Sequence, residues 1–215
     1  MNVNDLLDPQ LLPAIEAFPP LVLSRESLSA MRAVRAVPAD GLSDAVARTD
    51  HVVPGDPEVV VRVHRQVGAT TASPCVYSMH GGGYVVGTYA MDDPRFDRWC
   101  PLFDIVGVSV EYRLAPETPY PGPLDDCYRG LKWVYDHADE LGVDRGCIGV
   151  HGVSAGGGLA AALALLARDR GEVPLAFQLL DCPMIDDRQV THSSRLDGLA
   201  VWSKEANEFG WRAYL

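Results

Sequence analysis

Apolar residues recur at helical spacing over the first part of the chain, where prolines interrupt the pattern. One candidate helix begins at Asp8, which is followed by proline. A second is predicted over 24–36, because Ser24 is a good N-cap residue and Glu26 places a negative charge in the first helical turn. The N-terminal part of the chain is therefore expected to be helical.

The pattern changes after a turn at 55–57. Over 58–67 the residues alternate or run together as β-branched residues, which predicts a strand. Four further short apolar runs also predict strands, at 75–79, 105–112, 147–151 and 175–180.

Helical stretches separate the last three of these apolar runs, at 124–141 and 155–170. Apolar strands that alternate with helices are typical of βαβ units, in which a parallel sheet is buried on both faces. The predicted fold class is therefore α/β, with a mostly parallel sheet flanked by helices.

Composition limits the kinds of partner that the chain could bind. Its 215 residues fit one domain, and 47% hydrophobic with 22% charged residues is typical of a globular protein. A net charge of −11 argues against nucleic acid as a partner and is compatible with a neutral small molecule.

The cysteines and the N-terminus bear on location. The five cysteines form no C-x-x-C pair, and an odd number cannot all be paired internally, which favours a reducing compartment. The first 18 residues lack Lys, Arg and a continuous apolar run, so they do not resemble a signal peptide. No apolar run reaches the length of a membrane span. We expect a cytoplasmic protein with no membrane partner.

The segment 147–159 carries the strongest chemical motif. It reads as a strand, then Ser154 between Gly152 and Gly156, then a helix rich in alanine and leucine. A serine on such a tight turn needs these glycines, because side chains there would collide with the neighbouring strand and helix. The turn predicts a nucleophile at Ser154, because the N-terminus of the following helix favours the negative charge that develops during acyl transfer. The alternative is a purely structural turn.

A second motif, His80-Gly81-Gly82-Gly83, follows the apolar run 75–79. Consecutive glycines leave backbone N–H groups unshielded, and such donors bind a tetrahedral oxyanion. A flexible turn or a phosphate-binding loop is the alternative, although neither common phosphate-loop pattern fits. The serine motif downstream favours the oxyanion interpretation.

Together the motifs resemble those of one known family, the bacterial hormone-sensitive-lipase-like esterases of the α/β-hydrolase fold. The matching pieces fall in family order from about residue 50 to the end. They are His80-Gly81-Gly82-Gly83-Tyr84, Glu111-Tyr112-Arg113-Leu114-Ala115-Pro116-Glu117, Pro121 with Asp125-Asp126-Cys127, the segment 152–157, and Pro183-Met184-Ile185-Asp186-Asp187.

The resemblance implies a serine carboxylesterase that hydrolyses short to medium acyl esters through an acyl-enzyme, without metal or cofactor. Ser154 would be the catalytic nucleophile, and the amides of Gly82, Gly83 and Ala155 would form the oxyanion hole. His80 would organise the loop and would not be the general base. Arg113 and Glu117 would have structural ion-pair or hydrogen-bond roles.

The resemblance also divides the chain into three parts. Residues 1–50 would form a helical cap segment, 51–187 an incomplete α/β-hydrolase core, and 188–215 a cap-associated helical segment. The aromatic residues of the last segment are expected to pack in the cap or the core; they are Trp202, Phe209 and Trp211.

Two departures from the family pattern matter. Val153 replaces the acidic residue that usually precedes the nucleophile, which predicts altered activity or loop rigidity with the fold kept. In this fold the acid and the histidine of the triad follow the serine, yet only His192 does so here. His192 falls in the expected cap segment, and His151 is expected to be a core histidine.

We therefore expect the C-terminal strands to be missing from this sequence. The sheet edge at 175–180 would then be uncovered, and a second chain or another copy would cover it. Two other functions stay open: a catalytically impaired or ligand-binding remnant of the fold, and an amidase or peptidase, because the motifs do not specify the leaving group. The natural ester and the oligomeric state are also left open.

Overall fold

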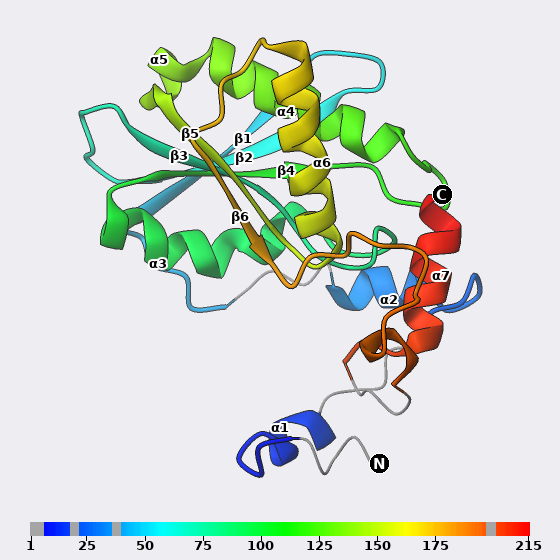
Figure 1. The fold of residues 1–215 in the computed structure, drawn as a ribbon. Coiled ribbons are helices and arrows are strands. Elements are labelled where there is room, and N and C mark those ends of the chain that lie inside the picture. The colour runs from blue at the N-terminus through cyan, green and yellow to red at the C-terminus, as the bar shows by residue number, and fades with distance from the viewer. Residues whose placement is uncertain (1–6, 18–21, 36–39, 197–200) are drawn as a thin grey trace.

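The computed structural model describes residues 7–17, 22–35, 40–196 and 201–215. Within them the chain forms a six-stranded sheet with helices on both faces, in the strand order β1-β2-β4-β3-β5-β6 (Figure 1). The α/β class is confirmed. The strands are β1 (Val46–Val53), β2 (Val59–Gln66), β3 (Ser73–Met79), β4 (Val106–Glu111), β5 (Val143–Val153) and β6 (Phe177–Asp181).

The sheet is mostly parallel but begins with an antiparallel hairpin. Strands β3 and β4, β3 and β5, and β5 and β6 pair in parallel, whereas β2 pairs antiparallel with both β1 and β4. The short turn between β1 and β2 explains the hairpin, because only antiparallel neighbours can be joined by so few residues. Helical segments connect β3 to β4, β4 to β5 and β5 to β6 along the chain.

The helical segments partly follow the predicted ones. Helix α6 spans the predicted 155–170, whereas the helix predicted over 124–141 divides into two at His137. The segments are α1 (Leu12–Glu16), α2 (Leu28–Arg35), η2 (Tyr89–Asp92), α3 (Asp93–Phe103), α4 (Gly122–Asp136), α5 (Ala138–Leu141), α6 (Ala155–Arg170), η3 (Ser193–Arg195) and α7 (Lys204–Tyr214).

The helices form one layer on each side of the sheet. Helices α4 and α6 contact each other and cover one face, while α3 contacts β1, β2 and β4 on the other (Figure 1). Central strands are therefore buried on both sides, as their apolar sequences predict. Leu131 of α4 and Leu159 of α6 are among the fully buried residues, each contributing about 2 kcal/mol of apolar burial.

Strand β6 forms one edge of the sheet in the described residues. Its side chains are largely exposed, with Phe177 at 41% and Leu179 at 48% of their full accessibility. Leu165 on the neighbouring helix α6 is also exposed, and a groove of about 630 Å³ runs between the end of α6 and the start of β6. This is the edge that the sequence predicts to be uncovered.

The predicted cap segment 1–50 overlaps the first strand of the sheet. Strand β1 begins at Val46, so the last five residues of the predicted cap segment 1–50 belong to the sheet, while the proposed division into three parts stays a prediction.

Across the described ranges, every helix is too short or too polar to cross a bilayer. The cytoplasmic location remains a prediction.

Candidate active site

Ser154 lies on the turn between β5 and α6 with a backbone conformation that side chains seldom adopt. Its φ is 55° and its ψ is −118°, and α6 begins at the next residue. A non-glycine residue with positive φ is uncommon and marks strain that the surrounding structure must support. The strand-turn-helix context predicted for Ser154 is thus present.

Close backbone approaches explain the glycines on either side of Ser154. A Cβ atom added to Gly152 would lie 2.0 Å from the carbonyl oxygen of Gly156. A Cβ added to Gly156 would lie 2.0 Å from the carbonyl oxygen of Met79, at the end of β3. These are the collisions with the neighbouring helix and strand that the sequence motif implies.

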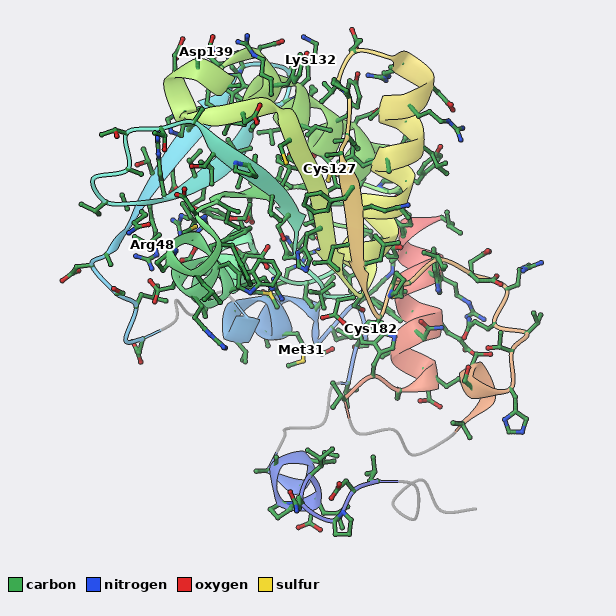
Figure 2. All side chains as sticks on the ribbon, turned by 60° about the vertical axis from the view of Figure 1, so that its left-hand side comes forward. Met31, Arg48, Cys127, Lys132, Asp139 and Cys182 are labelled. Atoms are coloured by element: carbon green, nitrogen blue, oxygen red, sulfur yellow. The ribbon has the colours of Figure 1, made fainter. Side chains whose placement is uncertain are left out.

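Hydrogen bonds to the end of β6 and to the residues after it hold the Ser154 turn in place. The Ser154 N–H donates to the carbonyl oxygen of Asp181 at 2.8 Å, and the Met184 N–H donates to the Ser154 carbonyl oxygen at 2.9 Å. Cys182 between them has a φ of 39° and lies just beyond β6, on the side of α7 (Figure 2). The turn at Ser154 is therefore held by hydrogen bonds to β6 and the residues after it, as well as by the glycines on either side of the serine.

The glycine motif forms a tight turn beside Ser154. Gly82 and Gly83 have φ values of 126° and 59°, and the N–H groups of Val85 and Val86 both donate to the Gly82 carbonyl oxygen. A Cβ on Gly81 would lie 3.5 Å from the Ser154 Cβ. The loop thus passes directly along the serine, and only glycine suits the conformations of its second and third glycines.

Ser154 and the glycine loop line the same cavity of about 330 Å³. Its apolar walls include Val86, Met91 and Trp202, and a Cβ on Gly83 would touch the Trp202 ring at 2.1 Å. Ala155 does not line the cavity but is fully buried as the first residue of α6, so its amide follows the serine at the helix N-terminus. The structure therefore brings together Ser154, Gly82, Gly83 and His80, with Ala155 adjoining them.

His80 is buried and tied to the loop. Its ring stacks on Tyr112 with centroids 4.2 Å apart, and its Nδ1 lies 2.8 Å from the carbonyl oxygen of Gly81, so Nδ1 carries the proton. The Tyr112 hydroxyl donates to the His80 carbonyl oxygen at 2.7 Å. Burial lowers the pKa of His80 to about 4, which keeps the ring neutral at pH 7. These contacts agree with a loop-organising role.

A buried polar cluster lies behind the cavity, and the sequence did not predict it. The Ser78 hydroxyl donates to Asp92 at 2.7 Å and lies 2.9 Å from Nδ1 of His151, while Asp92 pairs with Arg95. Asp92 and Arg95 also line the cavity. Burial raises the pKa of Asp92. Burial, with a smaller contribution from Arg95, lowers the pKa of His151 to about 4. His151 is a core histidine, as expected.

The described residues around Ser154 do not complete a catalytic triad. His80 is the one histidine among the described residues that line the cavity. His192 is exposed at the start of η3, and the Asp186 carboxylate is occupied by Arg188 at 2.7 and 2.8 Å. That pairing lowers the pKa of Asp186 to about 2.

Arg113 and Glu117 are both ion-paired, which confirms the structural roles expected of them. Arg113 donates to the fully buried Asp126 through Nε at 2.7 Å and Nη2 at 2.9 Å. Glu117 accepts two hydrogen bonds from Arg32 of α2, at 2.7 and 2.9 Å. Arg32 comes from a distant segment that no sequence pattern indicated, whereas Arg113 and Asp126 lie in two neighbouring motifs of the family.

Residues 76–215 match the family described as the alpha/beta hydrolase fold. The chain belongs to this family. The predicted hormone-sensitive-lipase-like group and the predicted α/β-hydrolase fold are confirmed by this match and by the relatives.

Two relatives are named as esterases. The chain is 44% identical to carboxylesterase NlhH of Mycobacterium tuberculosis over 126 residues, which cover 59% of the chain and 40% of the relative. It is 35% identical to an arylesterase of Saccharolobus solfataricus over 151 residues, which cover 70% of the chain and 48% of the relative. The aligned part is thus less than half the length of either relative.

A solved structure shows the same fold over the whole chain. The structure of a bacterial heroin esterase superposes with a TM-score of 0.90 and 37% identity, covering 100% of this chain and 70% of that one. The esterase LipW of Mycobacterium marinum gives a TM-score of 0.85 at 34% identity and covers 98% of this chain and 68% of that one.

Proposed function

We propose that the chain provides the nucleophile and the oxyanion donors of a carboxylic-ester hydrolase. One observation carries the proposal: Ser154, on its strained turn, lines the same cavity as the glycine turn at Gly82 and Gly83. The names of the relatives support an ester as the bond that is hydrolysed.

In the proposed reaction a general base takes the proton of Ser154 while its Oγ bonds to the ester carbonyl carbon. The bond from that carbon to the alcohol oxygen then breaks and the alcohol leaves with the proton, so that the acyl group stays on Ser154 as the acyl-enzyme. The amides of Gly82, Gly83 and Ala155 stabilise the oxyanion, and water then releases the acid. Loss of one such donor typically reduces the rate by about 10²- to 10³-fold. The strained backbone of Ser154 is compatible with this role, because the chain changes direction there between the end of β5 and the N-terminus of α6.

The proton of Ser154 requires a general base. We propose that the histidine and its acid partner lie on further polypeptide next to β6, because the triad partners of this fold follow the serine in the order acid and then histidine. The neutral, buried His80 is a poor candidate, since its Nδ1 proton is held by the Gly81 carbonyl oxygen.

The cavity supports a small ester as substrate. Its volume of about 330 Å³ is at the lower end of the range for small-molecule sites, and Val86, Met91, Val201 and Trp202 give it apolar walls. We propose short to medium acyl chains for this reason. No cofactor enters the proposed chemistry, which needs only a nucleophile, a base and hydrogen-bond donors.

The experiment compares the chain with its Ser154→Ala variant. Because the described residues supply no base, imidazole is added as an external base. Above the background rate of imidazole alone, we expect a fluorophosphonate probe to label the chain and p-nitrophenyl acetate and butyrate to be hydrolysed, with both activities lost in Ser154→Ala. Ser193→Ala, which removes an exposed serine, is the matched control and should keep both. Labelling or turnover that survives Ser154→Ala would remove Ser154 as the nucleophile.

A second candidate function is a ligand-binding remnant of the fold. It is favoured by Val153 in the cavity wall and by His80 as the sole histidine among the cavity residues described. An esterase and a ligand-binding remnant would give different results in binding, turnover and labelling experiments. A remnant would bind butyrate or a similar acid, detected by a shift in thermal unfolding, while showing neither turnover nor labelling by the fluorophosphonate.

We also propose that the 215-residue chain, when produced alone, associates with a second copy through the β6 edge. The exposed Phe177 and Leu179 support this, because an apolar unpaired edge readily pairs with another strand. Light scattering after gel filtration should show a dimer or larger species. Leu179→Lys should shift the chain towards monomer, whereas Val190→Lys, at an exposed apolar residue outside the sheet, should not. A stable wild-type monomer of 23.3 kDa would contradict the proposal.

A further inference from the structure

Arg32 joins helix α2 to the loop that carries the glycine turn. Its Nε donates to the carbonyl oxygen of Val85 at 2.8 Å, and its Nη2 donates to the carbonyl oxygen of Ala115 at 2.9 Å. Both η nitrogens also donate to the carboxylate of Glu117, at 2.9 and 2.7 Å. One planar guanidinium therefore holds three separate acceptors, a geometry that lysine cannot reproduce.

The two backbone acceptors belong to the structure that shapes the glycine turn. The Val85 N–H donates to the Gly82 carbonyl oxygen and so closes the turn, and the Val85 carbonyl oxygen then faces Arg32. The Ala115 N–H donates to the Tyr84 carbonyl oxygen at 2.9 Å, so the loop and the 115–117 segment are already joined to each other. Arg32 spans both sides of this junction.

The three acceptor groups of Arg32 are unequal in their expected effect. Glu117 is 62% exposed, and an exposed ion pair contributes little because water competes for both charges. The bonds to Val85 and Ala115 join a charged donor to part-buried carbonyl oxygens, which is a stronger interaction and fixes the backbone itself. The backbone bonds are thus the part of the contact that can affect the turn.

We propose that Arg32 is a positioning residue that holds the glycine turn in the conformation that presents the Gly82 and Gly83 amides to the cavity. The inference rests on the proposed function for its effect on catalysis, but its effect on the loop does not. Preorganised donors act on the transition state only when the turn is held in one geometry, and Arg32 supplies a hold from outside the cavity. Arg32 itself does not line the cavity around Ser154.

A simpler role would be to attach α2 to the surface. The structure offers a variant that separates the two, because Leu28 is the buried residue of the same helix and makes no hydrogen bond to the loop through its side chain. Leu28→Ala weakens the packing of α2 and leaves the guanidinium in place. Glu117→Gln weakens the exposed ion pair and leaves both backbone bonds. Arg32→Met keeps most of the stem and removes every donor.

The first experiment measures amide hydrogen exchange of the peptide that contains residues 82–86, in the full chain. Arg32→Met should speed this exchange by about tenfold, because the bonds that close and brace the turn open more often. Glu117→Gln and Leu28→Ala should stay within about twofold of the wild type. Equal exchange in Arg32→Met and the wild type would overturn the proposal, as would an equal increase in Leu28→Ala.

The second experiment measures the rate at which a fluorophosphonate labels Ser154, as a function of probe concentration. Arg32→Met should lower the limiting rate by about tenfold or more, since small displacements of catalytic donors have large effects, and it should leave the half-saturating concentration unchanged. Arg32→Lys should recover only part of the rate. A change confined to the half-saturating concentration would contradict positioning. If the wild type is not labelled even with imidazole as the external base, the proposed function fails, and the exchange experiment still decides the role of Arg32 in the loop.

Discussion

The backbone N–H of Ser154 donates a 2.8 Å hydrogen bond to the carbonyl oxygen of Asp181, the last residue of β6. The strained turn of the candidate nucleophile is therefore attached to the edge strand of the sheet. Because β6 pairs with β5 alone in the described residues, loosening of this edge would act directly on Ser154.

Gly156→Ala should destabilise the chain, because the added methyl group would collide with the carbonyl oxygen of Met79 at 2.0 Å and neither backbone segment can move freely. We expect a loss of at least about 2 kcal/mol in the free energy of unfolding by urea. Gly146→Ala is the control, since its methyl group would meet only the Asp144 side chain, at 3.3 Å. Equal stabilities of the two variants would show that the turn tolerates a side chain.

Trp202→Ala should widen the cavity, because its ring lies against Gly83 and forms part of the apolar wall. If the proposed esterase activity is present, the rate for a p-nitrophenyl octanoate relative to the acetate should rise by about three- to tenfold, the scale expected when an apolar pocket gains room. Trp133→Phe, on α4 away from the cavity, should leave the ratio unchanged. An unchanged ratio in Trp202→Ala would place the acyl chain elsewhere.

Asp126→Asn should be strongly destabilising. The carboxylate is fully buried and accepts hydrogen bonds from Arg113 and Arg129, so its loss leaves two guanidinium groups without their charge partner. We expect a loss of about 3 kcal/mol or more in the free energy of unfolding. Asp136→Asn breaks the exposed pair with Lys132 and should cost less than about 1 kcal/mol. Comparable losses in both variants would mean that burial does not set the strength of these pairs.

Two buried histidines should make the fold less stable in acid. Burial lowers the pKa of His80 and His151 from 6.5 to about 4, so between these values the unfolded chain binds protons that the folded chain does not. Stability is therefore kept above pH 6.5 and lost as the pH falls towards 4, by a contribution on the order of 3 kcal/mol for each histidine. The raised pKa of Asp92 acts in the opposite direction.

Urea unfolding at pH 7 and at pH 5 measures this effect. The loss of stability between the two values should be smaller in His151→Gln than in the wild type. His192→Gln, which replaces an exposed histidine, should show the wild-type loss. An unchanged pH dependence in His151→Gln would mean that the pKa of this ring is the same in the folded and the unfolded chain.

The sequence predicts the central strands well because β3, β4 and residues 148–152 of β5 are largely apolar and buried on both faces. It does not indicate β1, whose interior residues Thr49 and Asp50 are exposed, so the strand lacks an apolar face. Helix α3 is also missed, since Pro94 and Pro101 suggest a loop. Pro94 lies in the first turn, where no N–H is needed, and Pro101 falls in the last turn.

The residues of the candidate site also divide into those that the sequence indicates and those that it does not. Ser154, Gly82 and Gly83 can be recognised from the sequence because glycine motifs specify backbone conformations directly, and the structure brings them together. Arg32 and Asp92 cannot, because each bonds to residues far away in the chain, and the local pair of Arg95 with Asp92 does not by itself indicate a cavity. The sequence is equally silent on the hydrogen bond from Ser154 to Asp181, which depends on the pairing of β5 with β6.

Cys182, which follows β6 and lines the cavity, has a practical consequence. It is exposed, whereas Cys75, Cys100 and Cys127 are buried and Cys147 is only partly accessible. A thiol-reactive dye should therefore attach at the mouth of the cavity before it reaches the other cysteines. Protection of this thiol would report whether a small molecule occupies the space beside Ser154, even in a protein that performs no turnover.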